Sequence, residues 1–288
     1  MEKCLICGNQ DINVISAVVS GFLLERIWDN SIEKETSICH CRRCGFAFYT
    51  LRPDEMEMKK LYCNYRDAFY QKQRQKYDSW YSKEINALFD DPDIRRSRED
   101  DCNDFLSKHI DVDKIGSVLD YGGNTGVHIP GFLAHADRFV FDISGVETID
   151  GVRGFSDFDA VSERRYDFVM CLNMLEHVTD PKEIVEKITE LVAKDGYIYI
   201  EVPFDSPFYK HKPGKLQFLF NKHFSMKVIL DRFRLGLKFP YVMSEHINYF
   251  TEDSLRRLVG DVDVLSCETR VRKDSLGKSE CICMLIRT

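Results

Sequence analysis

The feature that most constrains this chain is an alternation of short apolar strands with helices that begins near Ile115. Strands are expected at residues 118–120, 138–143, 166–172 and 197–202. A helix is expected to begin at Asp180, which can cap it, with Pro181 at the first helical position. This alternation predicts a mainly parallel sheet with helices on both faces. Residues 262–271 and 279–286 are expected to add an antiparallel hairpin.

Two Cys-x-x-Cys-Gly turns lie near the N-terminus, formed by Cys4 and Cys7 and by Cys41 and Cys44. Each turn presents two sulfurs to one ion, and glycine permits the tight backbone that follows the second cysteine. A short β-rich segment buries little apolar surface, so a bound ion would supply part of its stability. The pattern predicts a structural Zn²⁺ ion bound by these four thiolates.

Three regions are expected along the chain. Residues 1–52 are expected to form a β-rich zinc-binding module, with strands at residues 13–19, 21–28 and 36–39. Residues 53–110 are expected to form a helical linker or cap, in which the charged stretch 90–104 holds a helix junction or loop. Residues 111–288 are expected to form the catalytic domain, with a substrate insertion at about 205–245.

Composition narrows the classes of partner. The chain has 288 residues and a net charge of −7, which argues against a general nucleic-acid binder. No apolar run approaches the roughly 18 to 20 residues that span a bilayer, so no transmembrane segment is expected. The 11 cysteines, with no export signal recognised, favour reduced thiols and a cytoplasmic location.

A glycine turn follows the strand at residues 118–120. It contains Gly122, Gly123 and Gly126, and glycines there let the backbone approach a ligand closely. Asp142 lies 22 positions after Asp120, at the end of the next strand, where a carboxylate can accept hydrogen bonds from ribose hydroxyls. The two features together predict a nucleoside cofactor at the carboxyl edge of the sheet.

The turn resembles the first motif of class I S-adenosylmethionine-dependent methyltransferases, Asp-x-Gly-x-Gly-x-Gly. Asp120, Gly122 and Gly126 match it, and Asn124 stands at the middle glycine. Residues 166–181 resemble the fourth-strand signature of that family, an apolar strand and then Leu-Glu-His-x-x-Asp-Pro. The resemblance implies a Rossmann-like, seven-stranded α/β sheet. It also implies a cofactor site made by Asp120, Gly122, Gly123, Gly126, Asp142 and Asn173, with a helix after the turn.

Residues 244–251 resemble an element that lies near the substrate in this family, Glu-His-x-x-Tyr-Phe-Ser/Thr. Together with the N-terminal module, this makes the whole chain similar to zinc-ribbon methyltransferases, which include deoxysugar C-methyltransferases. The resemblance implies that His246 is the catalytic base and that Glu245 orients it or contacts a hydroxyl. Those enzymes usually carry a tyrosine where this chain has Met243, so carbon or oxygen as the accepting atom stays open. His177 is expected to be structural.

Residues 209–238 carry a net positive charge, whereas the chain as a whole has a net charge of −7. They hold eight lysines and arginines against one acid, Asp231. A local positive field suits a phosphorylated or nucleotide-linked acceptor. A surface insertion or the face of a homodimer is the alternative interpretation.

The sequence therefore predicts methyl transfer from S-adenosylmethionine to a small anionic acceptor, with a nucleotide-linked or surface-polysaccharide sugar as the first choice. No nucleic-acid partner is expected. Two alternatives stay open at this point. One is methylation of RNA or protein, with the zinc ribbon as the recognition module. The other is a scaffold that binds the cofactor without catalysis.

Overall fold

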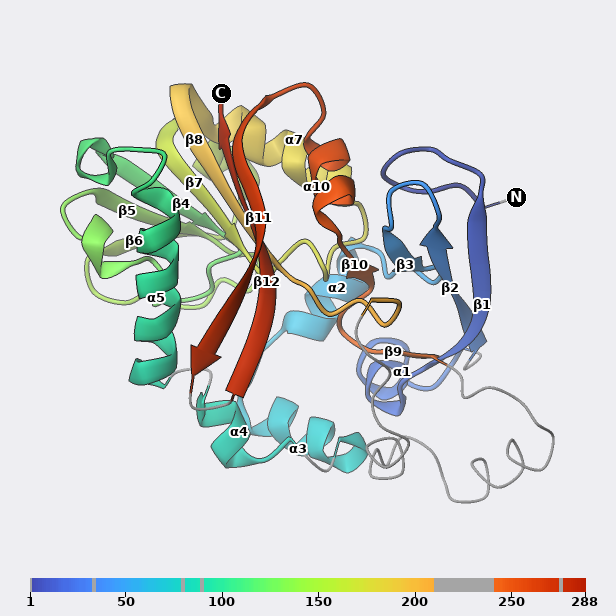
Figure 1. Ribbon diagram of the computed structural model, residues 1–288. Coiled ribbons are helices and arrows are strands. Elements are labelled where there is room, and N and C mark those ends of the chain that lie inside the picture. The colour runs from blue at the N-terminus through green and yellow to red at the C-terminus, as the bar shows by residue number, and fades with distance from the viewer. Residues whose placement is uncertain (1, 33–34, 79–80, 89–90, 210–240, 275–276) are drawn as a thin grey trace.

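The computed structural model describes residues 2–32, 35–78, 81–88, 91–209, 241–274 and 277–288, which form two neighbouring sheets (Figure 1). The smaller sheet has the strand order β10-β3-β2-β1-β9. Its strands are β1 (Ile12–Val19), β2 (Glu35–Cys41), β3 (Ala47–Tyr49), β9 (Tyr241–Met243) and β10 (Asn248–Tyr249). Two of its five strands thus come from residues far along the chain.

The larger sheet has seven strands in the order β11-β12-β8-β7-β4-β5-β6. These strands are β4 (Ser117–Tyr121), β5 (Asp137–Phe141), β6 (Val152–Phe155), β7 (Tyr166–Leu172), β8 (Val192–Pro203), β11 (Asp263–Asp274) and β12 (Gly277–Arg287). The strands from β6 to β8 pair in parallel, and β12 pairs antiparallel with both β8 and β11. The predicted α/β sheet with an antiparallel terminal hairpin is confirmed.

Helices cover both faces of the larger sheet. Helix α5 (Pro92–Leu106) packs Phe105 and Leu106 into the core on one face. On the other face, α7 (Pro181–Leu191) and α10 (Glu252–Val259) contribute Ile188, Leu191 and Leu255. Apolar residues spaced three or four apart give each helix one buried stripe. The short elements α6 (Phe158–Ser162) and η1 (Val112–Lys114) complete this part of the chain. No helix among the described residues combines the length and the apolar character needed to cross a membrane.

The prediction of a strand at residues 21–28 is wrong, because these residues form helix α1 (Gly21–Trp28). The hydroxyl of Ser20 accepts a hydrogen bond from the Leu23 N–H, which caps the first turn. Phe22, Leu23 and Leu24 are consecutive and all buried. Such a run lacks the alternation of buried and exposed residues that a half-exposed strand would show.

The stretch 90–104 was expected to hold a helix junction or loop. Its described part begins with Asp91, which caps α5 and follows α4 (Lys83–Leu88) in the chain, and residues 92–104 lie within α5. The Asp91 carboxylate accepts hydrogen bonds from the N–H groups of Asp93 and Ile94, and Pro92 occupies the first turn, where it needs no N–H partner. Three further helices precede it, as expected for a helical segment: α2 (Glu55–Tyr62), α3 (Ala68–Tyr77) and α4 (Lys83–Leu88).

The N-terminal region shares its core with the larger sheet. The Phe46 and Phe250 rings lie 5.1 Å apart between centroids, and both side chains are fully buried. Cys4 and Ile6 belong to the same cluster of buried residues as Leu255 of α10. The cysteine-rich region is therefore packed against the larger sheet and its helix α10, and Figure 1 shows the two sheets side by side.

Arg52 ties three segments together where the two sheets meet. Its guanidinium donates to the carbonyl oxygens of Val178 and Thr179, to the carbonyl of Ile247 and to the Asn248 side chain. Hydrogen bonds that involve a charged group contribute about 1.5 to 3 kcal/mol each. Arg52 thus fixes the loop after β7 against β10.

A buried carboxylate, Glu201 of β8, joins α5 to β11. Its carboxylate accepts two hydrogen bonds from Arg272, at 2.6 and 2.5 Å, and one from Arg98 at 3.1 Å. Burial alone would raise the pKa of Glu201, but the two guanidinium groups outweigh it and lower the pKa to about 2. This ionised carboxylate therefore stabilises the fold at neutral pH.

We expect Arg52→Gln to lower the free energy of unfolding by about 2 to 4 kcal/mol, because several carbonyl oxygens lose their donor. Arg42→Gln is the control, since Arg42 pairs with Asp11 on the surface with 64% of its side chain exposed, and it should change the value by less than about 0.5 kcal/mol. Urea unfolding measures both. Equal losses in the two variants would contradict the role given to Arg52.

The Glu201 network predicts a pH dependence. The pKa of Glu201 is about 4.3 in the unfolded chain and about 2 in the folded protein. Glu201 therefore contributes about 3 kcal/mol to stability at pH values above about 4.3, and this contribution is lost as the pH falls through 2. We expect Glu201→Gln to be about 3 kcal/mol less stable than the wild type at pH 7, with a smaller gap at pH 3. Urea unfolding at both pH values, with the exposed Glu183→Gln as control, measures the gap. A gap of constant size would exclude this explanation.

Candidate functional site

The glycine turn follows β4 directly and is tied to the next strand. The Gly122 N–H donates to the Phe141 carbonyl at 2.7 Å. Asn124 has a φ of +51°, a left-handed conformation that asparagine adopts more readily than most residues. The expected helix after the turn does not form, and a short 3₁₀ helix, η2 (Gly131–Leu133), follows instead. Pro130 has no N–H to donate to the Gly126 carbonyl, which prevents an α-helix from starting at the turn.

Two glycines in the turn are required by space and by backbone conformation. A Cβ atom on Gly123 would lie 2.4 Å from Cγ of Asp120, closer than any real contact. Gly126 has a φ of +79°, and a Cβ there would lie 2.9 Å from side-chain atoms of Val140 and Val152. The turn therefore lies directly over the end of β4 because it has no side chains at these positions.

Asp142 lies at the end of β5 and contacts the glycine turn. Its carboxylate accepts hydrogen bonds from the Asn124 N–H and the Ser144 N–H, both at 2.8 Å, and from the Ser144 hydroxyl at 2.5 Å. The side chain is half-buried. The structure thus brings together the two features from which the sequence predicted a nucleoside site.

Asp120, beneath the turn, is a buried carboxylate with no hydrogen-bond partner among the described residues. It is 1% exposed. Burial raises the pKa of Asp120 to about 7, although Arg98 acts in the opposite direction. An unpaired buried carboxylate costs stability, so this group is suited to a donor or cation supplied by a ligand.

Asn173 begins the segment after β7 and has a φ of +49°. Its N–H donates to the Glu201 carbonyl at 2.8 Å. The next residue, Met174, packs against the glycine turn, because a Cβ on Gly122 would lie 2.9 Å from Cγ of Met174. The predicted residues Asp120, Gly122, Gly123, Gly126, Asp142 and Asn173 therefore border one another at the carboxyl edge of the sheet.

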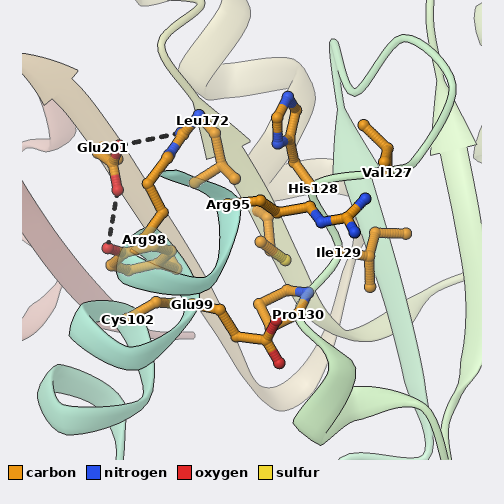
Figure 2. A pocket seen from close by; sticks show the side chains of 12 residues that line it. Arg95, Arg98, Glu99, Cys102, Val127, His128, Ile129, Pro130, Leu172 and Glu201 are labelled. Atoms are coloured by element: carbon orange, nitrogen blue, oxygen red, sulfur yellow. Dashed lines mark hydrogen bonds and ion pairs between the residues drawn. The ribbon is translucent and has the colours of Figure 1, made fainter. Parts of the chain in front are cut away.

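A pocket lies between α5 and the loop at residues 127–130, over the ends of β7 and β8 (Figure 2). Figure 2 shows Arg98 directed to Glu201, whereas Arg95 extends toward Val127. Burial, reinforced by the nearby Arg98, lowers the pKa of His128 to about 4, so its imidazole is neutral at pH 7. No ion pair to Arg95 occurs within the described part of the chain, which makes this pocket suitable for an anionic group.

His246 forms a pair with Asp205, a residue that the sequence did not single out. Its Nδ1 lies 2.7 Å from Asp205 Oδ2. Burial disfavours the charged imidazole, but the hydrogen bond and charge of Asp205 outweigh it and raise the pKa of His246 to about 9. The ring of His177 lies 4.8 Å from that of His246 between centroids, at 80°.

Glu245 points away from His246 and into the helical segment. Its carboxylate accepts hydrogen bonds from the Tyr70 hydroxyl and the Arg74 guanidinium. Burial alone would raise the pKa of Glu245, but Arg74 outweighs it and lowers the pKa. The structure thus gives Glu245 partners in α3, and no hydrogen bond between its side chain and His246 occurs among the described residues. The catalytic roles of both residues stay predictions.

Backbone hydrogen bonds bring the two histidine segments together. The carbonyl oxygen of Glu176 accepts from the N–H groups of Ile247 and Asn248, at 2.8 and 3.0 Å. Nδ1 of His177 lies 3.0 Å from the Glu245 carbonyl and 2.9 Å from the Tyr62 hydroxyl. The sequence could not reveal the contacts of Tyr62 and Asp205, because each joins residues more than 40 positions apart with no local pattern.

The four predicted metal-ligating cysteines lie together, apart from the glycine turn. The sulfurs of Cys4 and Cys44 and those of Cys7 and Cys41 are each 3.6 Å apart. All four sulfurs lie within 4.8 Å of one another. The basic stretch at residues 209–238, predicted to recognise an anionic acceptor, lies outside the described residues except for Tyr209.

Two methyltransferases are among the solved structures to which the chain is similar. The 1,6-didemethyltoxoflavin-N1-methyltransferase of Burkholderia thailandensis, solved with S-adenosylhomocysteine, is 16% identical, with a TM-score of 0.48 over 88% of this chain and 95% of that one. The magnesium protoporphyrin IX methyltransferase of Synechocystis, solved with S-adenosylmethionine, is 14% identical, with a TM-score of 0.43 over 80% and 97% of the two chains. No curated protein matches the sequence.

A family model described as a methyltransferase domain matches residues 70–263, which is more than half of the chain. The match covers the glycine turn, Asp142, Asn173 and the segment that contains His246. The chain belongs to this methyltransferase family, and the predicted class of enzyme, an S-adenosylmethionine-dependent methyltransferase, is confirmed.

Proposed function

We propose that this enzyme methylates a small anionic acceptor, with a nucleotide-linked or surface-polysaccharide sugar as the first choice. The observation that carries the proposal is the junction of the glycine turn with Asp142, next to the unpaired carboxylate of Asp120. The acceptor class rests on the sequence of residues 209–238, whose eight cationic side chains and single acid favour an anion.

The cofactor residues of this proposal have separate tasks. Asp142 would accept hydrogen bonds from the ribose hydroxyls, in exchange for its present bond to the Asn124 N–H. Asp120 would pair with the ammonium group of the methionine end, because its oxygens have no other partner in the described structure. Arg95 lines the adjacent pocket and is suited to the methionine carboxylate. The bound cofactor supplies an activated methyl group.

The acceptor is proposed to bind beside His246 and His177, where the loop after β7 meets the segment between β9 and β10. Holding the acceptor in line with the methyl group can contribute about 7 to 11 kcal/mol to catalysis at best. Glu245 would keep this segment in place through Tyr70 and Arg74.

We further propose that Cys4, Cys7, Cys41 and Cys44 bind a structural Zn²⁺ ion. Tetrahedral coordination with Zn–S bonds of about 2.3 Å places the sulfurs ~3.8 Å apart. The observed separations of 3.6 Å are close to that value. Four thiolates leave no open coordination position, so this ion would support the smaller sheet and take no part in methyl transfer.

Turnover is tested by the release of S-adenosylhomocysteine with a panel of acceptors. Phosphorylated and nucleotide-linked sugars should be methylated, and the matching neutral sugars should react at least about tenfold more slowly, because the positive field does not attract them. A preference for neutral sugars would contradict the proposed acceptor class. Cofactor binding without any turnover across a broad panel would favour the scaffold alternative.

Asp142→Asn should weaken the binding of S-adenosylhomocysteine at least about tenfold, or ~1.4 kcal/mol, because an amide is a poorer acceptor for two ribose hydroxyls. Asp137→Asn is the matched control, since Asp137 is an exposed acid at the opposite end of the same strand. Isothermal titration calorimetry measures both affinities. Equal affinity of Asp142→Asn and the wild type would remove Asp142 from the cofactor site.

Cys4→Ser should lower the zinc content by about one equivalent per chain and destabilise the smaller sheet, since the ion contributes folding free energy. Cys63→Ser is the control, because Cys63 is an exposed thiol that follows α2. Elemental analysis of the purified proteins gives the metal content. Unchanged zinc in Cys4→Ser would show that the ligands have been assigned incorrectly.

A further inference from the structure

Three side chains of the proposed acceptor site converge on one point. Glu176 and His177 belong to the loop after β7, and His246 belongs to the segment between β9 and β10. Their potential ligand atoms all lie within 4.8 Å of one another. His177 Nε2 is 3.7 Å from Glu176 Oε1, too far for a hydrogen bond and close enough to share a bound cation.

Each histidine uses its Nδ1 to contact a hydrogen-bond acceptor. His246 Nδ1 lies 2.7 Å from the Asp205 carboxylate, and His177 Nδ1 lies 3.0 Å from the Glu245 carbonyl oxygen. Because these oxygens accept hydrogen bonds, both Nδ1 atoms carry the proton. Nε2 is then the remaining ligand atom of His177, and also of His246 once a bound metal displaces its second proton. Histidines that bind metals in proteins are held in this way by a carboxylate or a backbone carbonyl.

Glu176 supplies the third group. Its side chain is 1% exposed, and neither carboxylate oxygen has a hydrogen-bond partner among the described residues. A buried carboxylate without a donor is costly, and here it lies beside Nε2 of His177, which can act as an acceptor, and beside the ring of His246. A cation between the three groups would satisfy all of them at once.

We propose that Glu176, His177 and His246 bind one divalent transition-metal cation, and that Asp205 and the Glu245 carbonyl orient the two imidazoles. Two histidines and one carboxylate leave open coordination positions and suit iron, cobalt, nickel or zinc better than calcium. This site is separate from the four cysteines, whose ligands are all sulfur.

The role that we assign to the cation in methyl transfer rests on the proposed function. An oxygen or nitrogen of the methyl acceptor would occupy an open position, where the cation lowers its pKa and fixes its orientation. His246 would then hold the cation, and the proton released from the acceptor would pass to solvent water, so in this proposal His246 is a metal ligand and not the base. A cation at this place also favours an acceptor that carries an anionic group close to the methylated atom.

Cobalt titration tests the site without either substrate. The zinc-loaded chain is passed over a chelating resin and titrated with Co²⁺ alone, and the visible absorption of the ion is recorded. We expect one Co²⁺ per chain, with a spectrum that lacks thiolate-to-metal charge transfer, because only nitrogen and oxygen ligands are present. No bound Co²⁺, or a spectrum with thiolate charge transfer only, would overturn the proposal.

Amino-acid substitutions test which residues bind the Co²⁺ ion. Glu176→Gln should weaken Co²⁺ binding at least about tenfold, and Asp205→Asn should weaken it about 10 to 100-fold, as expected for a group that orients a ligand. Glu183→Gln, which changes an exposed acid of α7, should bind like the wild type. Equal affinity of Glu176→Gln and the wild type would contradict the assignment.

The outcomes separate this proposal from the proposed function. A chain that binds S-adenosylhomocysteine and methylates an acceptor, but binds no Co²⁺ at this site, would overturn the metal site and leave the proposed function intact. A chain that binds Co²⁺ with the expected variant pattern, but does not transfer methyl groups to anionic sugars, would support the metal site and contradict the acceptor class.

Discussion

The candidate site depends on the hydrogen bonds that hold the loop after β7 against β10. The Glu176 carbonyl accepts two backbone N–H groups from that segment, and the Asn248 amide donates to the carbonyl oxygens of Leu175 and Val178. Arg52 adds donors from the end of the N-terminal region. Asn248 is fully buried, so water cannot replace these bonds. They place His177 beside His246, although the two side-chain bonds of Asn248 join residues that are 70 and 73 positions apart.

Buried carboxylates in this structure differ by whether they have partners. Glu201 is 2% exposed, and two arginines keep it ionised with a pKa of about 2. Asp120 and Glu176 are each 1% exposed without a donor, and burial raises their pKa values to about 7 and about 8. An unpaired buried group costs about 1 to 3 kcal/mol. Glu201 thus stabilises the fold, whereas the other two carboxylates mark positions where a ligand would supply the missing partner.

Much of the larger sheet could be predicted because its signals are local. The apolar strands, the Asp180–Pro181 helix start and the glycine turn each lie within a few residues of the element they specify. Residues 21–28 have no such local signal, because a short apolar run without alternation fits a buried strand as well as a helix. The Ser20 cap and the packing of α1 decided in favour of the helix. Pro130 is a local signal against a helix after the turn. The structure shows its effect, because a short 3₁₀ helix follows Pro130 in place of an α-helix.

The sequence by itself determined the methyltransferase class, the paired cysteines and the positions of Asp120 and Asp142, because chain order and spacing fix what lies at the end of each strand. Only the tertiary structure decided that β9 and β10 join the cysteine-rich sheet, that Glu245 turns to Tyr70 and Arg74, and that Asp205 faces His246. Those contacts join segments distant in the chain, and they depend on which side chains can satisfy one another once water is excluded.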